Sequence, residues 1–278
     1  FAVSRLLCLI AILTAGTSMS VAGTIMQQLA RNKFVSPSTS GTLESASLGL
    51  LVATLLFAGA PVIVKMLIAF AFALAGTLIF MQILARVTFR DAIFVPLIGI
   101  LFGGVIGAMT TFLAYRYDLL QSLGAWMTGD FSAVLRGRYE LLYLAVPITA
   151  LAYLFADRFT LAGMGEAFAV SLGLNYRQVL HLGLTLVALV TAVVVLTVGA
   201  IPYLGLIVPN VVSIMLGDNL RRSLPYTALL GAIFVLVCDV IGRTVRYPYE
   251  IPIGLVVGVV GGVLFLALLM RRGAYGTA

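Results

Sequence analysis

Few residues in this chain could carry out acid–base or metal chemistry. There is one histidine, His181, and two cysteines, Cys8 and Cys238, in 278 residues. Asp239 and Arg243 stand four positions apart, a spacing that places them on one helix face and predicts an ion pair. His181 lies near the end of an apolar stretch, as a hydrogen-bonded interfacial residue does, and the cysteines read as small buried hydrophobes. The sequence therefore predicts no metal site and no catalytic residues.

Motifs for nucleotide binding and hydrolysis are also absent from the sequence. It contains no G-x-x-x-x-G-K-[ST], no H-E-x-x-H and no G-x-S-x-G. We therefore expect a chain that is not an enzyme, holds no cofactor and does not bind ATP through a phosphate loop. An ion-driven carrier would place ionisable residues along its ion path. Asp239 is the one acid that stands well inside an apolar stretch.

The composition indicates a membrane protein. Hydrophobic residues make up 62% of the chain, charged residues 10%, and the mean hydropathy is +1.15. A soluble domain cannot bury so large an apolar share. The net charge of +7 comes from basic residues spread over short loops. That pattern favours membrane orientation over nucleic-acid binding, and we expect lipid but no nucleic acid as a partner.

The hydrophobic pattern predicts an all-α polytopic membrane protein with one transmembrane domain over residues 1–278. Nine apolar spans have approximate limits 6–29, 45–60, 62–85, 92–115, 140–156, 178–200, 203–217, 226–245 and 253–270. An odd number of spans puts the two ends on opposite sides. If the loop after the first span is cytoplasmic, ten of the 17 basic residues lie inside, which agrees with the positive-inside rule.

Two segments between spans stand out. Residues 161–175, LAGMGEAFAVSLGLN, are rich in small residues and contain Glu166. The chosen orientation makes this segment cytoplasmic, and we expect a short helix that receives a mechanical push from an ATP-hydrolysing partner. Residues 117–135 fall on the outer side and contain Trp126, the one tryptophan. We expect an interfacial helix there.

Polar residues within the spans are candidates for a translocation path. Hydroxyl groups often bond the carbonyls of their own helix instead, and Pro209 can equally mark a static kink. Glycines recur every four residues in two series, Gly99, Gly103 and Gly107 and then Gly254, Gly258 and Gly262. They predict close helix packing or a subunit interface. The candidates for the path are Ser18, Ser20, Gln27, Thr110, Thr111, Pro209 and Asn210.

Four motifs in order resemble one family over the whole chain. They are the Arg31–Pro37 stretch, Gly165-Glu166-Ala167 with Leu172-Gly173, Tyr203–Asn210, and Asp239–Arg243 followed by Tyr249–Gly254. Together they resemble the permease subunits of binding-protein-dependent ABC importers for iron–siderophores, haem and cobalamin.

The chain departs from the family pattern at three places. Lys33-Phe34 replaces Pro-Leu, Asn210 replaces a histidine, and Arg5-Leu6-Leu7-Cys8 keeps only the first arginine of R-L-P-R. The change at Lys33-Phe34 is similar to a subgroup associated with catecholate siderophores.

The resemblance implies a type II ABC-importer permease in the bacterial plasma membrane that moves a ferric siderophore inward. Its partners would be a second permease, copy or paralogue, two ATPase subunits that bind ATP, and an extracytoplasmic binding protein. Family members have ten helices, so we expect that the first family helix is not in this chain. The implied docking residues for the binding protein are Arg5, Arg243 and Arg246. Those for ATPase coupling are Gly163, Gly165, Glu166, Ala167, Leu172 and Gly173.

Other interpretations stay open. A secondary carrier driven by an ion gradient, or a passive channel for a small solute, would also be polytopic and helical. Within the same family, cobalamin or haem could replace the ferric siderophore as cargo.

Overall fold

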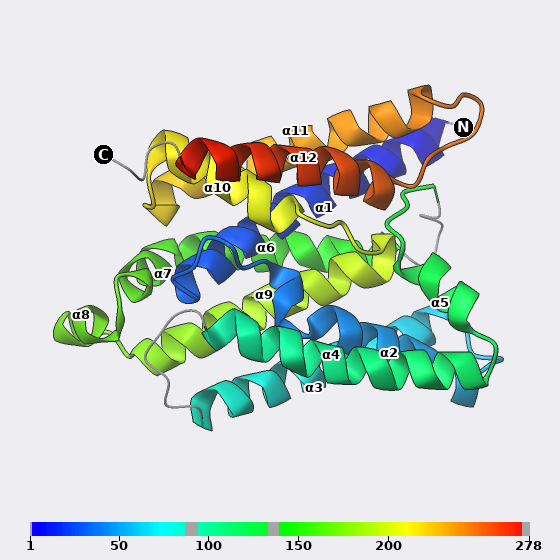
Figure 1. Cartoon of the computed structure of the whole chain (residues 1–278), viewed down its shortest axis with the longest axis horizontal. Coiled ribbons are helices and arrows are strands. Elements are labelled where there is room, and N and C mark those ends of the chain that lie inside the picture. Colours follow the sequence, from blue (N-terminus) through cyan, green and yellow to red (C-terminus); the bar gives the residue numbers. More distant parts are fainter. Residues whose placement is uncertain (1, 87–93, 133–138, 274–278) are drawn as a thin grey trace.

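The computed structural model describes residues 2–86, 94–132 and 139–273, and this part of the chain is built from helices. Its long helices form one bundle with their axes roughly along one direction (Figure 1). The elements are α1 (Ala2–Leu29), η1 (Pro37–Ser40), α2 (Thr42–Leu56), α3 (Val62–Arg86), α4 (Phe94–Arg116), α5 (Leu120–Met127), η2 (Tyr139–Leu144), α6 (Ala145–Leu154), α7 (Ala156–Gly163), α8 (Glu166–Ser171), α9 (Tyr176–Val198), α10 (Leu204–Leu216), α11 (Leu220–Thr244) and α12 (Ile253–Gly273).

Length and composition allow several of these helices to cross a membrane. Five qualify in the described residues: Leu6–Leu29, Val62–Ile83, Leu97–Arg116, Tyr176–Val198 and Leu220–Thr244. A sixth span is possible if Glu140–Leu154 and Ala156–Gly163, which meet at a 60° bend, are counted together. Three shorter apolar helices are Thr42–Leu56, Leu204–Leu216 and Ile253–Leu268. The predicted polytopic all-α class is therefore confirmed.

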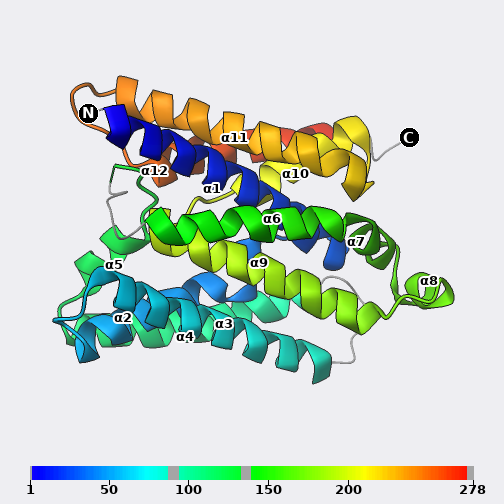
Figure 2. The ribbon, with the colours of Figure 1, turned by 180° about the vertical axis from the view of Figure 1, so that it is seen from behind.

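The two ends of the bundle carry different features. The short helix α8 projects at one end, whereas α5 and the connection between α11 and α12 lie at the other (Figures 1 and 2). The helix α1 begins near the α5 end and α12 finishes near the α8 end (Figure 1). The end with α8 corresponds to the predicted cytoplasmic side, and we call it the inner end.

The core lies around α1 and α9. About 72% of the apolar window of α9 is buried, against 22% for α4, so α9 is central and α4 peripheral. The helix α1 crosses α10 and α11 at glycines. A Cβ on Gly23 would collide with the backbone of Gly205, and one on Gly16 would lie 2.7 Å from the carbonyl oxygen of Gly231. Close helix crossings at small residues give packing that lipid alone does not provide.

The connection between α1 and α2 turns back into the bundle. A Cβ on Gly205 would lie 2.6 Å from Pro37 Cδ and 3.2 Å from the carbonyl oxygen of Met19. Pro37 therefore lies level with Met19, which is ten residues, or about 15 Å, before the end of α1 at Leu29. Accordingly, α2 starts near the middle of the bundle and runs toward the α5 end (Figure 1).

Candidate functional site

The segment predicted to couple to an ATPase forms the inner tip of the molecule. Gly163 ends α7, Gly165 has a positive φ of 116° where α8 begins, and Gly173 has a φ of 77° after it ends. Glycine adopts this left-handed backbone region without strain. Glu166 and Ala167 are exposed on α8. The predicted short helix is present, and its coupling role stays a prediction.

The inner tip also exposes an apolar surface that the sequence interpretation missed. Met164, Phe168, Val170 and Leu172 are each between 43% and 57% exposed, around the buried Ala169. In the sequence, the segment stands out for its small residues and Glu166, and nothing is predicted there about its apolar side chains. Clustered exposed apolar side chains next to one charge are typical of a protein–protein contact.

The end of α1 reaches this inner tip. Gly163 packs so closely on Gln28 that a Cβ there would collide with the Gln28 side-chain amide. At Gly165, a Cβ would lie 3.5 Å from Nη1 of Arg31. The coupling segment therefore touches the residues that lead into the connection between α1 and α2.

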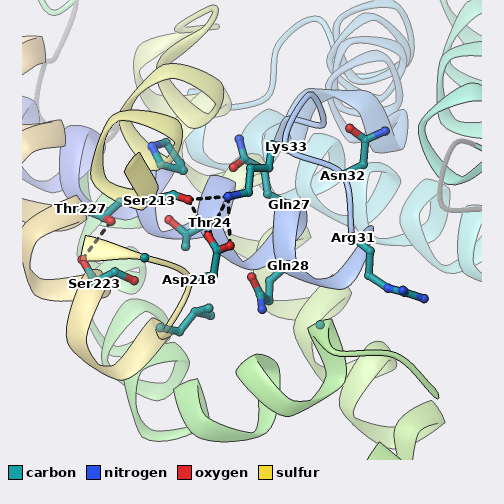
Figure 3. Close-up of a pocket in the computed structure, with 14 residues that line it drawn as sticks. Thr24, Gln27, Gln28, Arg31, Asn32, Lys33, Ser213, Asp218, Ser223 and Thr227 are labelled. Carbon is teal, nitrogen blue, oxygen red and sulfur yellow. Dashed lines mark hydrogen bonds and ion pairs between the residues drawn. The ribbon is translucent and has the colours of Figure 1, made fainter. Parts of the chain in front are cut away.

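A polar cavity of about 240 Å³ lies behind the inner tip. Its walls come from α1, α10, α11 and the connection after α1, as Figure 3 shows. The residues that line it are Thr24, Gln27, Gln28, Arg31, Asn32, Lys33, Gly163, Pro209, Ser213, Gly217, Asp218, Leu220, Ser223 and Thr227. The cavity thus brings together Gln27 and Pro209 from the predicted path with Gly163 from the predicted coupling segment.

An ion pair closes part of the cavity wall. Lys33 Nζ donates to Asp218 Oδ1 at 2.9 Å and to the hydroxyl oxygen of Ser213 at 2.6 Å (Figure 3). Ser213 Oγ in turn donates to Asp218 Oδ1 at 2.5 Å. The three residues tie the connection after α1 to the turn between α10 and α11. Of them, Lys33 is noted in the sequence only as a departure from the family pattern, and Ser213 and Asp218 are missed by sequence reasoning. A contact over 185 positions has no local sequence signal.

Asn210, on α10, also binds the connection between α1 and α2. Its Nδ2 donates to the carbonyl oxygens of Lys33 and Leu206, both at 2.7 Å. Gln27 Nε2 donates to the same Leu206 oxygen at 3.2 Å. Three of the residues predicted for the path, Gln27, Pro209 and Asn210, therefore meet at α10.

The other four predicted path residues lie elsewhere. Ser18 Oγ bonds the Thr14 carbonyl oxygen and Thr110 Oγ1 bonds the Ile106 carbonyl oxygen, so both hydroxyls serve their own helices. Ser20 is buried at the crossing of α1 and α11, against Gly231. Thr111 is exposed on α4. Their role in a path stays a prediction.

The arginines predicted to meet a binding protein differ in how many interactions they already make within the chain. Arg243 Nε donates to Asp239 Oδ2 at 2.7 Å, and its Nη1 donates to Glu250 Oε1 at 3.0 Å. The predicted pair is therefore present, and two nitrogen atoms of the Arg243 guanidinium already donate hydrogen bonds within the chain. Arg246 is exposed and lies over the ring of Tyr249, with its Cζ 5.9 Å from the ring centroid. The side chain of Arg5 lies outside the described residues.

The end of the bundle opposite the inner end, which we call the outer end, is held together by backbone hydrogen bonds. Ala200 N–H donates to the Met127 carbonyl oxygen at 2.9 Å, and Gly254 N–H donates to that of Gly129 at 3.0 Å. These bonds join the ends of α5 and α9 to the start of α12. The helix predicted within 117–135 is present as α5, with Leu123 buried and Trp126 packed beside it.

The part of the chain that the structure describes is a helical bundle with five helices, or six if the bent pair is counted, that are long and apolar enough to cross a membrane. The model of the FecCD transport family matches residues 1–271, and the chain therefore belongs to that family. It is a permease of the iron–siderophore class of ABC importers.

Two curated relatives show how similar the chain is to known permeases. It is 57% identical over 272 residues to the petrobactin import system permease protein YclN of Bacillus subtilis, covering 98% of this chain and 86% of the relative. It is 44% identical over 268 residues to the ferric-anguibactin transport system permease protein FatD of Vibrio anguillarum, covering 96% and 85%.

Solved structures share the fold. An inward-facing conformation of a metal-chelate type ABC transporter superimposes with a TM-score of 0.81 at 24% identity, covering 96% of this chain and 87% of that one. PsaBC from Streptococcus pneumoniae, in complex with Fab, gives a TM-score of 0.61 at 18% identity, covering 92% and 88%.

Proposed function

We propose that this chain is the permease subunit of an ABC importer that moves a ferric siderophore inward across the bacterial plasma membrane. The observation that carries the proposal is the exposed apolar inner tip around Glu166, on a chain of this family whose sequence lacks a phosphate loop. Such a chain needs force from outside, and a surface of this kind is where a partner can deliver it. The chain itself does no chemistry and holds no cofactor, and ATP binds to the partner ATPase subunits.

The membrane arrangement we propose has nine crossings. The five long helices, the bent pair and the three shorter apolar helices add up to that number. The beginning of α1 and the end of α12 at opposite ends of the bundle support an odd count (Figure 1). The shorter helices α2 and α10 do not have to span the full thickness alone, because η1 precedes α2 and a non-helical segment with the buried Ile201 precedes α10.

The partners we propose follow from three surfaces. The inner tip, with Gly163, Gly165, Glu166, Ala167, Leu172 and Gly173, faces one of two ATPase subunits. Arg246, supported by Arg5 and Arg243, faces an extracytoplasmic binding protein, since exposed arginines steer an acidic partner. The exposed apolar faces of α4 and α12 receive a second permease, copy or paralogue, as well as lipid.

The cargo class comes from the relatives. The relatives that are 57% and 44% identical to this chain are named for petrobactin and for ferric anguibactin. We propose a ferric siderophore, with ferric petrobactin as the first compound to test. Cobalamin and haem are the alternative cargoes, and a secondary carrier or a passive channel is the alternative mechanism.

Uptake into proteoliposomes that contain the permease, its ATPase and its binding protein tests the function. We expect uptake of radioiron-labelled ferric petrobactin to require ATP and the binding protein, and to persist when ion gradients are collapsed. Uptake that follows an ion gradient without ATP would indicate a secondary carrier, and ATP-independent equilibration would indicate a channel. ATP-dependent uptake of cobalamin or haem in place of the siderophore would overturn the cargo assignment.

A further inference from the structure

A groove of about 590 Å³ lies between α7 and the start of α9, at the inner end of the bundle. The two helices pack side by side there (Figure 2). We call this space the inner groove, and it shares no lining residue with the polar cavity behind the inner tip. Its wall combines apolar and polar side chains, among them Leu174, Val179, Leu182, Arg158, Asn175 and Gln178.

The inner groove lies at the depth of a membrane–water interface. Gln178 and Leu182 are the third and seventh residues of α9, so they lie about 3 and 9 Å from its inner end. A Cβ on Gly183 would lie 3.0 Å from Cε1 of Phe159, so α7 passes α9 at this level, next to Arg158. The 23 residues of α9 extend about 35 Å, and the hydrocarbon core of a bilayer is about 30 Å thick. The first turns of α9 therefore reach the lipid headgroups.

Arg158 has no anionic partner within the described residues. It is exposed, and it takes part in none of the four ion pairs found there. The acid beside it in the sequence, Asp157, is bound to Arg221. The Arg158 guanidinium lies over the ring of Phe155, with Cζ 5.1 Å from the ring centroid, a contact that does not use its N–H donors. An arginine at interface depth with these donors left over is suited to a phosphate, which it can bind through two parallel hydrogen bonds.

Membrane orientation alone accounts for only part of this arrangement. Basic residues are common at the cytoplasmic ends of membrane helices, where water solvates them. Arg158 instead borders a groove with an apolar wall that includes Leu174 and Leu182. Asn175 uses its Oδ1 to cap α9 by accepting from the backbone amide of Gln178, so its own amide group can still donate. A cation and amide donors beside an apolar wall match the two parts of a phospholipid, an anionic head and an acyl chain.

We propose that the inner groove binds an anionic phospholipid of the cytoplasmic leaflet. Arg158 binds the lipid phosphate, and an acyl chain lies along Leu174 and Leu182. The inference goes beyond the transport function and needs only the proposed orientation, in which the inner end is cytoplasmic. Basic pockets between membrane helices on the cytoplasmic side recognise anionic headgroups in this way.

Lipid binding to the purified permease tests the proposal. Native mass spectrometry of the whole chain, titrated with phosphatidylglycerol or with phosphatidylcholine of equal chain length, gives a Kd for the first bound lipid. We expect phosphatidylglycerol to bind more tightly, and Arg158→Gln to raise its Kd about tenfold while leaving that of phosphatidylcholine constant. The matched control is Arg222→Gln, which removes the same charge from an exposed position at the start of α11, outside the groove. This control should leave both values of Kd unchanged.

A second variant tests the groove separately from the charge. Gln178→Trp places a bulky side chain at an exposed position in the groove and keeps Arg158. We expect it to raise the Kd of phosphatidylglycerol as well, and it serves alone if Arg158→Gln does not fold. A native Kd in both variants would overturn the proposal.

Other outcomes would assign the inner groove to a different ligand. Full competition by inorganic phosphate would indicate a site for a free anion in place of a lipid. Weaker association with the ATPase in both variants, with unchanged lipid binding, would assign the groove to the ATPase, because its wall includes Leu172 of the inner tip. Lipid binding is measured without cargo or ATP, so a negative result here leaves the proposed import function standing, and a failure of ATP-dependent uptake leaves the lipid site standing.

Discussion

Asn210 and Lys33 form a hydrogen bond of 2.7 Å, from the side-chain Nδ2 of Asn210 to the backbone carbonyl oxygen of Lys33. Both residues stand out in the sequence as departures from the pattern of the family that the chain resembles, and they are 177 positions apart. Lys33 also pairs with Asp218 through its ammonium group. The two departures are therefore parts of one polar cluster that fixes the connection after α1 to the inner half of α10.

We expect Asn210→Asp to destabilise the permease more than Asn210→Ala. Alanine removes the donor to two carbonyl oxygens, which costs about 1–2 kcal/mol. Aspartate keeps the shape but presents an oxygen to the carbonyl oxygens of Lys33 and Leu206. Thermal unfolding of the purified permease measures both variants. An Asp variant as stable as the native protein would show that the amide does not donate there.

The ion pair between Lys33 and Asp218 is expected to contribute little at high salt. Both side chains are partly exposed, at 37% and 55%, and such pairs contribute about 0.2–1 kcal/mol. A double-mutant cycle with Lys33→Met and Asp218→Asn should give a coupling energy in that range at low salt. The coupling should shrink in 1 M salt, because screening acts on exposed charges. A coupling energy that is zero at low salt would contradict the ion pair.

We expect Gly23→Ala to disrupt the crossing of α1 and α10. The added Cβ would collide with the backbone of Gly205, and backbone cannot move aside as a flexible side chain can. Overpacking of this kind costs about 1–3 kcal/mol. Gly124→Ala in α5 is the matched control, since nothing lies within 4 Å of its Cβ position. That control should leave the midpoint of thermal unfolding unchanged or raise it, and equal losses in both variants would rule out the close crossing.

Features of the fold that depend on residues close together in the sequence are predicted, whereas those that depend on contacts between distant residues are not. The long apolar stretches predict α1, α3, α4, α9 and α11, because a helix of about 20 apolar residues is a local property. The 60° bend between α6 and α7 falls at Phe155, with no proline or glycine to mark it. The starting depth of α2 was also missed, because it depends on Pro37 packing on Gly205.

The candidate site shows the same division. The pair of Asp239 and Arg243 is visible in the sequence because helix geometry relates positions four apart. Lys33, Ser213 and Asp218 meet only in the folded chain. The glycines Gly103 and Gly107 are recognised as a packing face, but nothing in the sequence says that the face receives Glu44.

Arg243 and Arg246 are expected to respond differently to substitution. Arg243→Gln leaves Asp239, only 12% exposed, without its partner. Because the Arg243 side chain is 37% exposed, we expect a loss of stability smaller than the about 3–5 kcal/mol of a fully buried pair. Arg246→Gln should leave folding unchanged, because this side chain is exposed at the outer end. It should instead weaken binding of the extracytoplasmic partner and reduce the salt dependence of that binding.

Unfolding curves and binding isotherms over a salt series distinguish these two effects. The double variant Asp239→Asn with Arg243→Gln should recover part of the stability, because it removes both charges. If Arg246→Gln binds the partner as tightly as the native permease at every salt concentration, the docking role of Arg246 is wrong.

The exposed apolar side chains of α8 should matter for assembly with the ATPase. Phe168 is 43% exposed at the inner tip, although an aromatic side chain normally gains about 1.5–3 kcal/mol from burial. A partner that covers Phe168 would recover that free energy, so we expect Phe168→Ala to weaken the ATPase–permease association by about tenfold or more. The matched control is Leu229→Ala on α11, which is 60% exposed on a membrane-spanning helix.

Measured dissociation constants in one detergent make the comparison quantitative. Loss of affinity in Phe168→Ala, with native affinity in Leu229→Ala, would assign the tip to the ATPase. Because Phe168 and Leu229 are both exposed, at 43% and 60%, neither change should alter thermal unfolding, and a fall in stability would point to a structural cause instead. Native affinity in the Phe168 variant would mean that the partner binds elsewhere, and α8 would then lose its proposed place as the point where force enters the permease.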